Sequence, residues 1–318
     1  MNAFVVRKLI GTLVVLLASS VLIFGIIYLL PGDPAVSLAP PNARPEQIAA
    51  IRARYHLDEP LYRQYISWLG RALSGDLGTS IANRTEVSQL LRTKVAVTVQ
   101  LAIASFLLAL AVAVPLGIAA GLKPRGLCAR LLEGYTTLGF AVPNFWTGIL
   151  MILLFGVHLK WLPTSGFVSF LDDPVASLRH LVMPSLVLSV ATSVVISNYL
   201  RDSIVTVTSM EYVVAAQAKG LRRSTIIRKH ILRNALVPVL TIAMLQLGLM
   251  MAGTVITESL FSIPGLGRLI LDAINDRDYP VLQGALLLVV AIFIVLNLIT
   301  DLLYGIIDPR IRVAGTSK

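Results

Sequence analysis

The side chains that could contact a solute inside this chain are few, and all of them interrupt or border long uncharged stretches. They are Asn144, Asn198, Gln246, Glu258, Asn297 and Asp301. If those stretches cross a membrane, an ionisable group among them is costly and by default faces a cavity or a partner. Glu258 and Asp301 end their stretches, where water or headgroups can reach a carboxylate. The amides could line a path or join helices by hydrogen bonds, and the second use is the commoner one.

The sequence lacks the motifs of common enzymes. No G-x-x-x-x-G-K-[ST] loop is present to cradle nucleotide phosphates, and no G-x-S-x-G elbow or H-E-x-x-H pair occurs. The four histidines are scattered, and the single cysteine, Cys128, has no histidine near it in the sequence. We therefore expect a non-catalytic chain with no metal site and no cofactor of its own.

Composition places the chain in a membrane. Of its 318 residues, 56% are hydrophobic and 14% are charged, and the mean hydropathy is +0.80. An average soluble domain carries roughly 25% charged residues. A net charge of +10 would suggest nucleic acid as a partner in a soluble protein, whereas in a membrane protein basic residues set the orientation.

Six stretches without Asp, Glu, Lys or Arg are long enough to cross a bilayer, because a spanning helix needs ~20 residues. They are 9–32, 95–122, 134–159, 180–200, 234–257 and 279–300. The expected fold class is an all-α integral membrane protein with six transmembrane helices.

Lys and Arg in the connections predict that both termini are cytoplasmic. With this orientation the inner side carries fifteen basic residues, seven of them in 201–233, and the two short outer loops carry four. The outer segment 33–94 holds eight more, but a connection of that length translocates largely regardless of its charge.

The outer segment 33–94 is predicted to contain two helices. One runs from Pro45 to Tyr55, and the other starts after Pro60 and ends near Gly70 and Gly75. The second helix places four apolar or aromatic side chains on one face: Leu61, Tyr65, Trp68 and Leu69. A scaffold lying on the outer leaflet is favoured over a binding site.

The inner loop 201–233 is predicted to contain a short helix rich in small residues. This helix is expected over 210–219 with Gly220 as its stop, and Ser224 is expected to cap a second, basic helix over 225–236. A thin helix can enter a groove on another protein. Because the basic charges suit anionic headgroups equally well, the residues alone leave a protein groove and a lipid surface open.

Motifs along nearly the whole chain resemble those of one transporter family. A-A-Q-A-K-G-L at 215–221 and R-K-H-I-L-R-N-A-L-V-P at 228–238 are similar to the cytoplasmic loop of ABC importer permeases. Further matches are L-L-P-G-D-P at 29–34, Y-H-L-D-E-P-L at 55–61, G-D-L-G-T-S at 75–80, V-P-N-F-W at 142–146, E-S-L-F-S-I-P-G-L-G at 258–267, D-Y-P-V-L-Q-G at 278–284 and D-L-L-Y-G-I-I-D-P-R-I-R at 301–312. Together they resemble the first permease subunit of the dipeptide and oligopeptide (peptide/nickel) importers. One departure is Val214, which stands where the general pattern has a glutamate.

This resemblance implies the type I ABC importer permease fold in a bacterial plasma membrane. Residues 1–32 would form the first span, 33–94 the extracytoplasmic segment, and 95–318 a five-helix core that includes the coupling loop 201–237. The residues implied to couple to an ATPase are Val214, Ala215, Ala216, Ala218, Lys219, Gly220 and Leu221. A bulky charge at Ala216 or Gly220 is expected to block transport and to leave the helix bundle folded.

The partners implied by the resemblance are a second homologous permease, two ATPase subunits or domains, an extracytoplasmic substrate-binding protein and membrane lipid, with no nucleic acid. ATP and Mg²⁺ would bind to the ATPase subunits. Permeases similar to this chain handle dipeptides, longer peptides, glutathione or nickel, and peptides are the expected substrate. The competing classes are an ATP-independent secondary transporter or channel, opposed by the few charges at membrane depth, and a membrane enzyme, opposed by the missing motifs.

Overall fold

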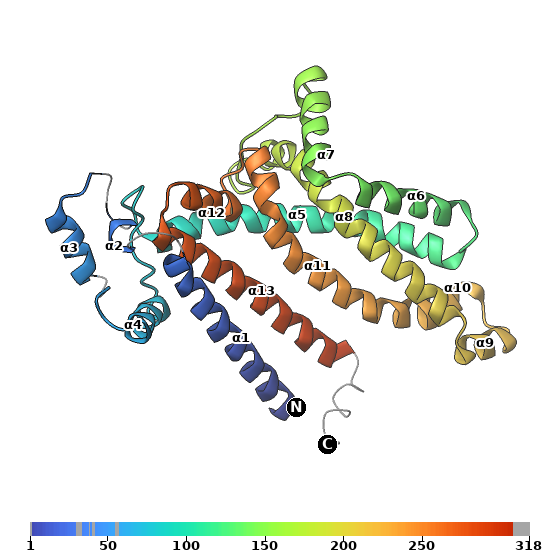
Figure 1. Cartoon of the computed structure of the whole chain (residues 1–318). Coiled ribbons are helices and arrows are strands. Elements are labelled where there is room, and N and C mark those ends of the chain that lie inside the picture. Colours follow the sequence, from blue (N-terminus) through green and yellow to red (C-terminus); the bar gives the residue numbers. More distant parts are fainter. Residues whose placement is uncertain (1, 30–33, 38, 40–41, 55–56, 308–318) are drawn as a thin grey trace. The chain divides into compact units, whose positions relative to one another are not determined.

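The computed structural model describes residues 2–29, 34–37, 39, 42–54 and 57–307. Within these ranges the regular elements are helices, and the one β-type pairing is an isolated bridge between Thr79 and Glu86 (Figure 1). The chain divides into two compact units, Met1–Thr98 with Pro264–Val295 and Val99–Ile263 with Leu296–Lys318. The prediction of an all-α protein is confirmed for the described residues.

Four helices of the described chain are long and apolar enough to cross a bilayer. They are α5 (Val87–Leu122), α8 (Pro174–Thr208), α11 (Arg233–Leu260) together with the short turns α10 (Arg223–Thr225) and η2 (Ile226–Leu232) before it, and α13 (Tyr279–Ile307). Helix α1 (Asn2–Leu29) covers the first predicted stretch as far as Leu29, and residues 30–32 lie outside the described residues. Five of the six predicted stretches therefore coincide with helices.

The third predicted stretch, 134–159, does not form one straight helix. Helix α6 (Leu127–Ala141) stops before Val142, and α7 (Asn144–Met151), continued by the π-helical η1 (Ile152–His158), departs at 96°. The cause is Pro143, which lacks an N–H and disfavours helical geometry in the residue before it. Val142 is accordingly extended, with φ −98° and ψ 118°. Among the described residues, four unbroken helices are long enough to span, or five spans form if this bent pair crosses as one, and the apolar part of α1, Ile10–Gly25, is shorter.

The outer segment contains the two predicted helices, α3 (Pro45–Arg54) and α4 (Leu61–Leu73), after the single turn α2 (Pro34–Ser37). Helix α4 continues through Gly70, so the prediction that this glycine stops it is wrong. The stop comes at Ser74 and Gly75, and Gly75 has the positive φ of 87° that glycine adopts without strain.

The predicted aromatic face of α4 packs on α1. Tyr65 and Trp68 lie against Phe24 with ring centroids 5.6 and 5.7 Å away, in the geometry typical of aromatic pairs. The Tyr65 hydroxyl also shares a hydrogen bond of 2.8 Å with the hydroxyl of Ser20. Two of the four predicted residues therefore contact another helix of the same unit.

A buried carboxylate holds the loop before α5 to the start of α13. Asp278, only 2% exposed, accepts hydrogen bonds from the Ser80 hydroxyl and from the backbone N–H groups of Ala82 (3.2 Å) and Val281 (3.4 Å). The last of these satisfies an orphan donor in the first turn of α13. One side chain thereby links segments almost two hundred residues apart.

The same unit closes around a small apolar core contributed by α5, α12 (Leu266–Asn275) and α13. A Cβ on Gly284 would lie 2.7 Å from a methyl carbon of Val87, so α13 reaches α5 only because this residue is glycine. The N–H of Leu266 at the start of α12 donates to the Thr98 hydroxyl at 2.8 Å. These contacts set the register of the three helices.

Replacing Asp278 with alanine is expected to destabilise this unit. The change removes the acceptor of the Ala82 N–H and of the Ser80 hydroxyl, which is only 2% exposed, at a cost of about 1–3 kcal/mol. The measurement is the midpoint of thermal unfolding in mild detergent, with the exposed neighbour Asp276→Ala as the matched control. Equal midpoints for the two variants would contradict the anchoring role of Asp278.

Candidate functional site

A short helix projects between α8 and α11 at the position predicted for the loop helix. Helix α9 (Glu211–Ala218) follows the extended residue Met210. It ends at Gly220, whose φ is 73° and whose N–H donates to the Gln217 carbonyl at 2.9 Å. This left-handed glycine is a common helix terminator. The predicted helix and its stop are confirmed, whereas Ser224 lies inside the next helical turn and does not cap it.

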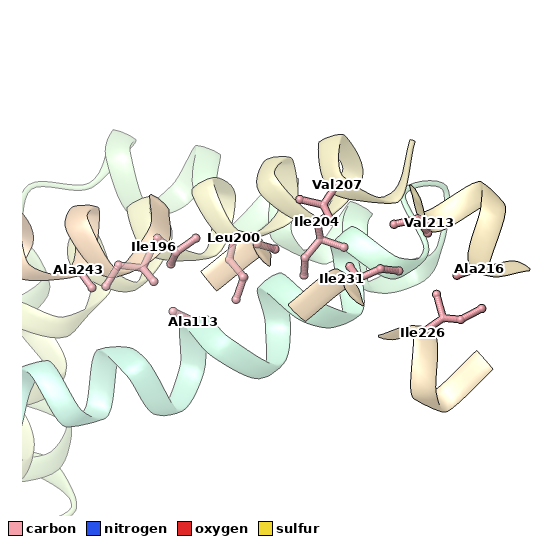
Figure 2. Packing of buried hydrophobic residues seen from close by; sticks show 12 residues of the cluster. Ala113, Ile196, Leu200, Ile204, Val207, Val213, Ala216, Ile226, Ile231 and Ala243 are labelled. Atoms are coloured by element: carbon pink, nitrogen blue, oxygen red, sulfur yellow. The ribbon is translucent and has the colours of Figure 1, made fainter. Parts of the chain in front are cut away.

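Helix α9 has an inward and an outward face. Val213 (0% exposed) and Ala216 (6% exposed) point into an apolar cluster with Ile226 and Ile231, as Figure 2 shows. The other six predicted coupling residues are exposed: Val214, Ala215, Ala218, Lys219, Gly220 and Leu221. Ala216 belongs to the internal packing of the hairpin that α9 forms with η2, so a charge there would disturb the fold, contrary to the expectation from sequence.

The cluster beneath α9 continues along α8 and α11 and joins them to α5. Ile196, Leu200, Ile204 and Val207 of α8 are buried in it, together with Ala113 of α5 and Ala243 of α11 (Figure 2). Ala235 and Val239 of α11 belong to the same cluster. Burying an apolar side chain of this size stabilises a fold by about 1.5–3 kcal/mol. The hairpin is therefore an extension of the helix bundle's core.

Glycines let α5 approach α8 closely. A Cβ on Gly117 would lie 2.9 Å from the Ser197 carbonyl oxygen, and one on Gly121 would lie 2.8 Å from the Cβ of Ile204. Contacts this short exclude any side chain. Small residues at a helix interface are a typical device of membrane bundles.

Polar contacts reinforce the join between the hairpin and α11. The Asn234 amide donates to the Tyr212 hydroxyl at 2.9 Å and to the His230 carbonyl at 2.7 Å, which ties α9 to the start of α11. The Ser203 hydroxyl of α8 donates to the Ala235 carbonyl at 2.9 Å.

The predicted path residues lie in different settings. Asn198 donates to the Thr136 hydroxyl (2.7 Å) and to the Val194 carbonyl (2.9 Å), and so joins α8 to α6. Of the two uses expected for these amides, Asn198 therefore shows the joining of helices by hydrogen bonds. Glu258 is fully buried near the end of α11, where its backbone carbonyl accepts from the N–H of Ile263 at 2.8 Å.

The remaining path candidates do not form one cluster with these. Asn144 is exposed at the first position of α7, and Gln246 and Asn297 are half-buried on α11 and α13. Gln246 and Glu258 are twelve residues apart on one helix, which separates them by ~18 Å. The side chain of Asp301 lies outside the described side chains.

A groove beside the hairpin was missed by the sequence reasoning. It holds about 930 Å³, its surface is more apolar than polar, and its polar side chains are Tyr199, Asp202, Ser203, Thr206, Tyr212, His230 and Asn234. The available signal was the spacing of Tyr199, Asp202 and Thr206, which places them on one face of α8. Among the described residues, no three His, Cys, Asp or Glu side chains are grouped to hold a metal ion.

Comparison with known proteins identifies the family. Residues 113–313 match the family described as "Binding-protein-dependent transport system inner membrane component", and residues 1–102 match the N-terminal region of the same membrane components. The chain belongs to this family of ABC importer permeases. The membrane location, the resemblance to peptide importers and the all-α permease fold class are thereby confirmed, whereas the six spans and the cytoplasmic termini stay predictions.

Close relatives carry the names of permease subunits. The chain is 36% identical over 312 residues to a probable peptide ABC transporter permease protein of Sinorhizobium fredii, covering 98% of this chain and 100% of that protein. It is 35% identical over 336 residues to the dipeptide transport system permease protein DppB of Escherichia coli K12 (98% and 99% covered). It is 38% identical over 309 residues to the glutathione transport system permease protein GsiC of Salmonella paratyphi A (97% and 98% covered).

A solved structure shares the fold. A chain of the inward-facing MetNI methionine ABC transporter matches with a TM-score of 0.56 at 17% identity, over 69% of this permease and 97% of that chain. At this level of identity the match concerns the fold alone.

The two faces of α9 predict opposite effects of a glutamate on folding. Ala216→Glu places an uncompensated carboxylate in the apolar cluster, which is expected to open the hairpin at a cost of several kcal/mol. Ala215→Glu, one residue earlier on the exposed face, is expected to leave the hairpin intact. Limited trypsin cleavage at Lys219, Arg222 and Arg223 measures the difference, and equal cleavage rates in the two variants would contradict the assignment of faces.

Proposed function

We propose that this permease forms half of the translocation pathway of an ATP-driven peptide importer and that the outward face of α9 docks onto an ATPase subunit. The docking residues are Val214, Ala215, Ala218, Lys219, Gly220 and Leu221. The observation that carries the proposal is that α9 exposes small side chains outward while its inward face is embedded in the core shared with α8 and α11. Such a helix can enter a groove and transmit the groove's movement.

The proposed assembly contains a second homologous permease, two ATPase subunits or domains and an extracytoplasmic substrate-binding protein. ATP and Mg²⁺ bind to the ATPase subunits, and hydrolysis takes place there. The permease itself is non-catalytic and carries no cofactor. Both termini are cytoplasmic in this assembly, an orientation supported by the seven basic residues of 201–233.

ATP can drive the transporter only because it binds one conformation of the ATPase pair better than the other. When that pair closes, α9 moves with it. Because the α9 cluster extends into α8, α11 and α5, these helices follow α9 as one packed block and switch the pathway between its inward-facing and outward-facing states. Asn144, Gln246 and Asn297 are candidates for the pathway lining, whereas the hydrogen bonds of Asn198 and the full burial of Glu258 favour structural roles.

A peptide substrate is supported by what the relatives' names share. One is named for peptides, one for dipeptides and one for glutathione, which is itself a peptide. Nickel carried by the same machinery is the alternative substrate. The binding protein that delivers the substrate contributes to this choice.

A charge on the docking face is expected to uncouple the transporter. Ala218→Glu would bury an unpaired carboxylate in the ATPase groove and weaken docking by at least about tenfold. The measurement is ATP-dependent uptake of a labelled dipeptide into proteoliposomes, together with co-purification of the ATPase subunits. The matched control is Ala53→Glu, at an exposed alanine of α3.

Undiminished uptake and undiminished co-purification in Ala218→Glu would contradict the docking assignment. Uptake that follows an ion gradient and ignores ATP would instead favour a secondary transporter. Uptake of nickel in place of the peptide would preserve the docking assignment and overturn the substrate.

A further inference from the structure

We propose that an apolar crevice along the first part of α11 binds one anionic phospholipid, with its phosphate at Arg233. The crevice holds about 310 Å³ and lies among α5, α8 and α11. Its lining residues are Phe106, Leu110, Val114, Ile196, Arg233, Leu236, Val237, Val239, Leu240, Ala243 and Met244. Every one of them except Arg233 is apolar, so the crevice offers one cation and a long hydrocarbon surface.

Arg233 stands at one end of this surface. It is the last charged residue before the uncharged stretch 234–257, so it lies where the hydrocarbon of the bilayer begins. On α11 it shares a face with Val237, Leu240 and Met244, which follow at the spacing of successive helical turns. Within the described chain its exposed guanidinium makes no ion pair with a carboxylate.

The length of the crevice matches one leaflet. From Arg233 to Met244 the helix rises ~16 Å, about half of the ~30 Å hydrocarbon thickness of a bilayer. On α5 the lining residues Phe106, Leu110 and Val114 recur every fourth position and form the facing wall. A headgroup at Arg233 would therefore direct its acyl chain along the crevice to the middle of the membrane.

The volume favours a lipid chain over a helix of another subunit. An α-helix is ~10 Å wide with its side chains, so a helix could only lie over a crevice of about 310 Å³, whereas a single acyl chain is narrow enough to lie within it. A partner helix would also have to supply a carboxylate opposite Arg233. A phospholipid carries both the negative charge and the slender apolar chain.

The charge around Arg233 selects an anionic lipid. Arg222, Arg223, Arg228 and Lys229 precede it on the same basic segment, and all four are exposed. Basic residues at this depth attract acidic headgroups. Bound lipid would fill the crevice between α5 and α11 and so make the packed group of α5, α8 and α11, which holds α9, more rigid.

The test is native mass spectrometry of the transporter purified in mild detergent from its own membrane. After delipidation it is titrated with phosphatidylglycerol or with phosphatidylcholine of the same acyl chains. We expect one phosphatidylglycerol per permease, bound in preference to phosphatidylcholine. Arg233→Gln should weaken phosphatidylglycerol binding about fivefold, the contribution of one near-surface cation, and should leave phosphatidylcholine binding unchanged.

Two variants control this result. Arg228→Gln removes an exposed cation that does not line the crevice and should weaken phosphatidylglycerol binding less than Arg233→Gln does. Leu240→Trp fills the crevice and should abolish binding of both lipids. Equal phosphatidylglycerol affinity in Arg233→Gln and Arg228→Gln would overturn the proposal.

A photo-crosslinking side chain at Leu236, which is 41% exposed on the crevice wall, identifies the occupant directly. Capture of phospholipid supports the proposal. Capture of another membrane protein would assign the crevice to a subunit interface and overturn it.

Discussion

The close packing of α5 against α8, with α11 on the same apolar core, is the constraint on which the position of α9 and its hairpin depends. Gly117 and Gly121 bring the two backbones to a distance that no side chain permits. That approach brings Ala113 into the apolar cluster that runs along α8 and α11 and ends beneath α9. In a bilayer the lipid tails are as apolar as leucine, so such helices associate by close van der Waals packing and specific polar contacts. The orientation of α9, and therefore which of its residues can face a partner, follows from this core.

The sequence motifs that identify the family have structural explanations in this fold. G-D-L-G-T-S at 75–80 and D-Y-P-V-L-Q-G at 278–284 meet where Ser80 donates to Asp278, and Gly284 admits Val87. The proline of V-P-N-F-W breaks the third apolar stretch into two helices. In E-S-L-F-S-I-P-G-L-G the residue Ser262 takes a left-handed φ of 50° between α11 and α12. These motifs set breaks, turns and close approaches, while the contact surface proposed for the ATPase subunit lies on the outward face of α9.

Hydrophobicity and charge predicted most of the helices because burial in lipid imposes a simple length requirement on each span. The prediction was wrong at 134–159, since counting charges ignores what Pro143 does to the backbone of Val142. It was also wrong at Gly70, because the packing of α4 on α1 keeps the helix intact past this glycine, which is a weak helix former. Local sequence indicates where α9 begins and ends, but it does not indicate which face is buried. Ala216 and Ala218 are chemically identical, and only the position of Ile226 and Ile231, brought by the next helix, distinguishes them.

Local sequence likewise does not indicate what the polar residues at membrane depth contact. Whether Asn198 faces a path or another helix depends on Thr136, sixty-two residues away on α6. The groove beside α9 likewise combines side chains of α8, α9, η2 and α11. Such sites form only when distant segments of the chain pack together, so the sequence alone does not show which residues meet there.

The central claim is that α9 moves together with α8 and α11 as one body, and a cleavable cross-link tests it most directly. In a Cys128→Ser background, Tyr212→Cys and Asn234→Cys are joined by a short, reducible bifunctional thiol reagent across the contact that their native side chains make. The account predicts that the cross-linked transporter retains the ATP-driven uptake of the unlinked double variant. Loss of uptake on linking, restored when the linker is reduced, would show that α9 must move relative to α11 and would contradict the account.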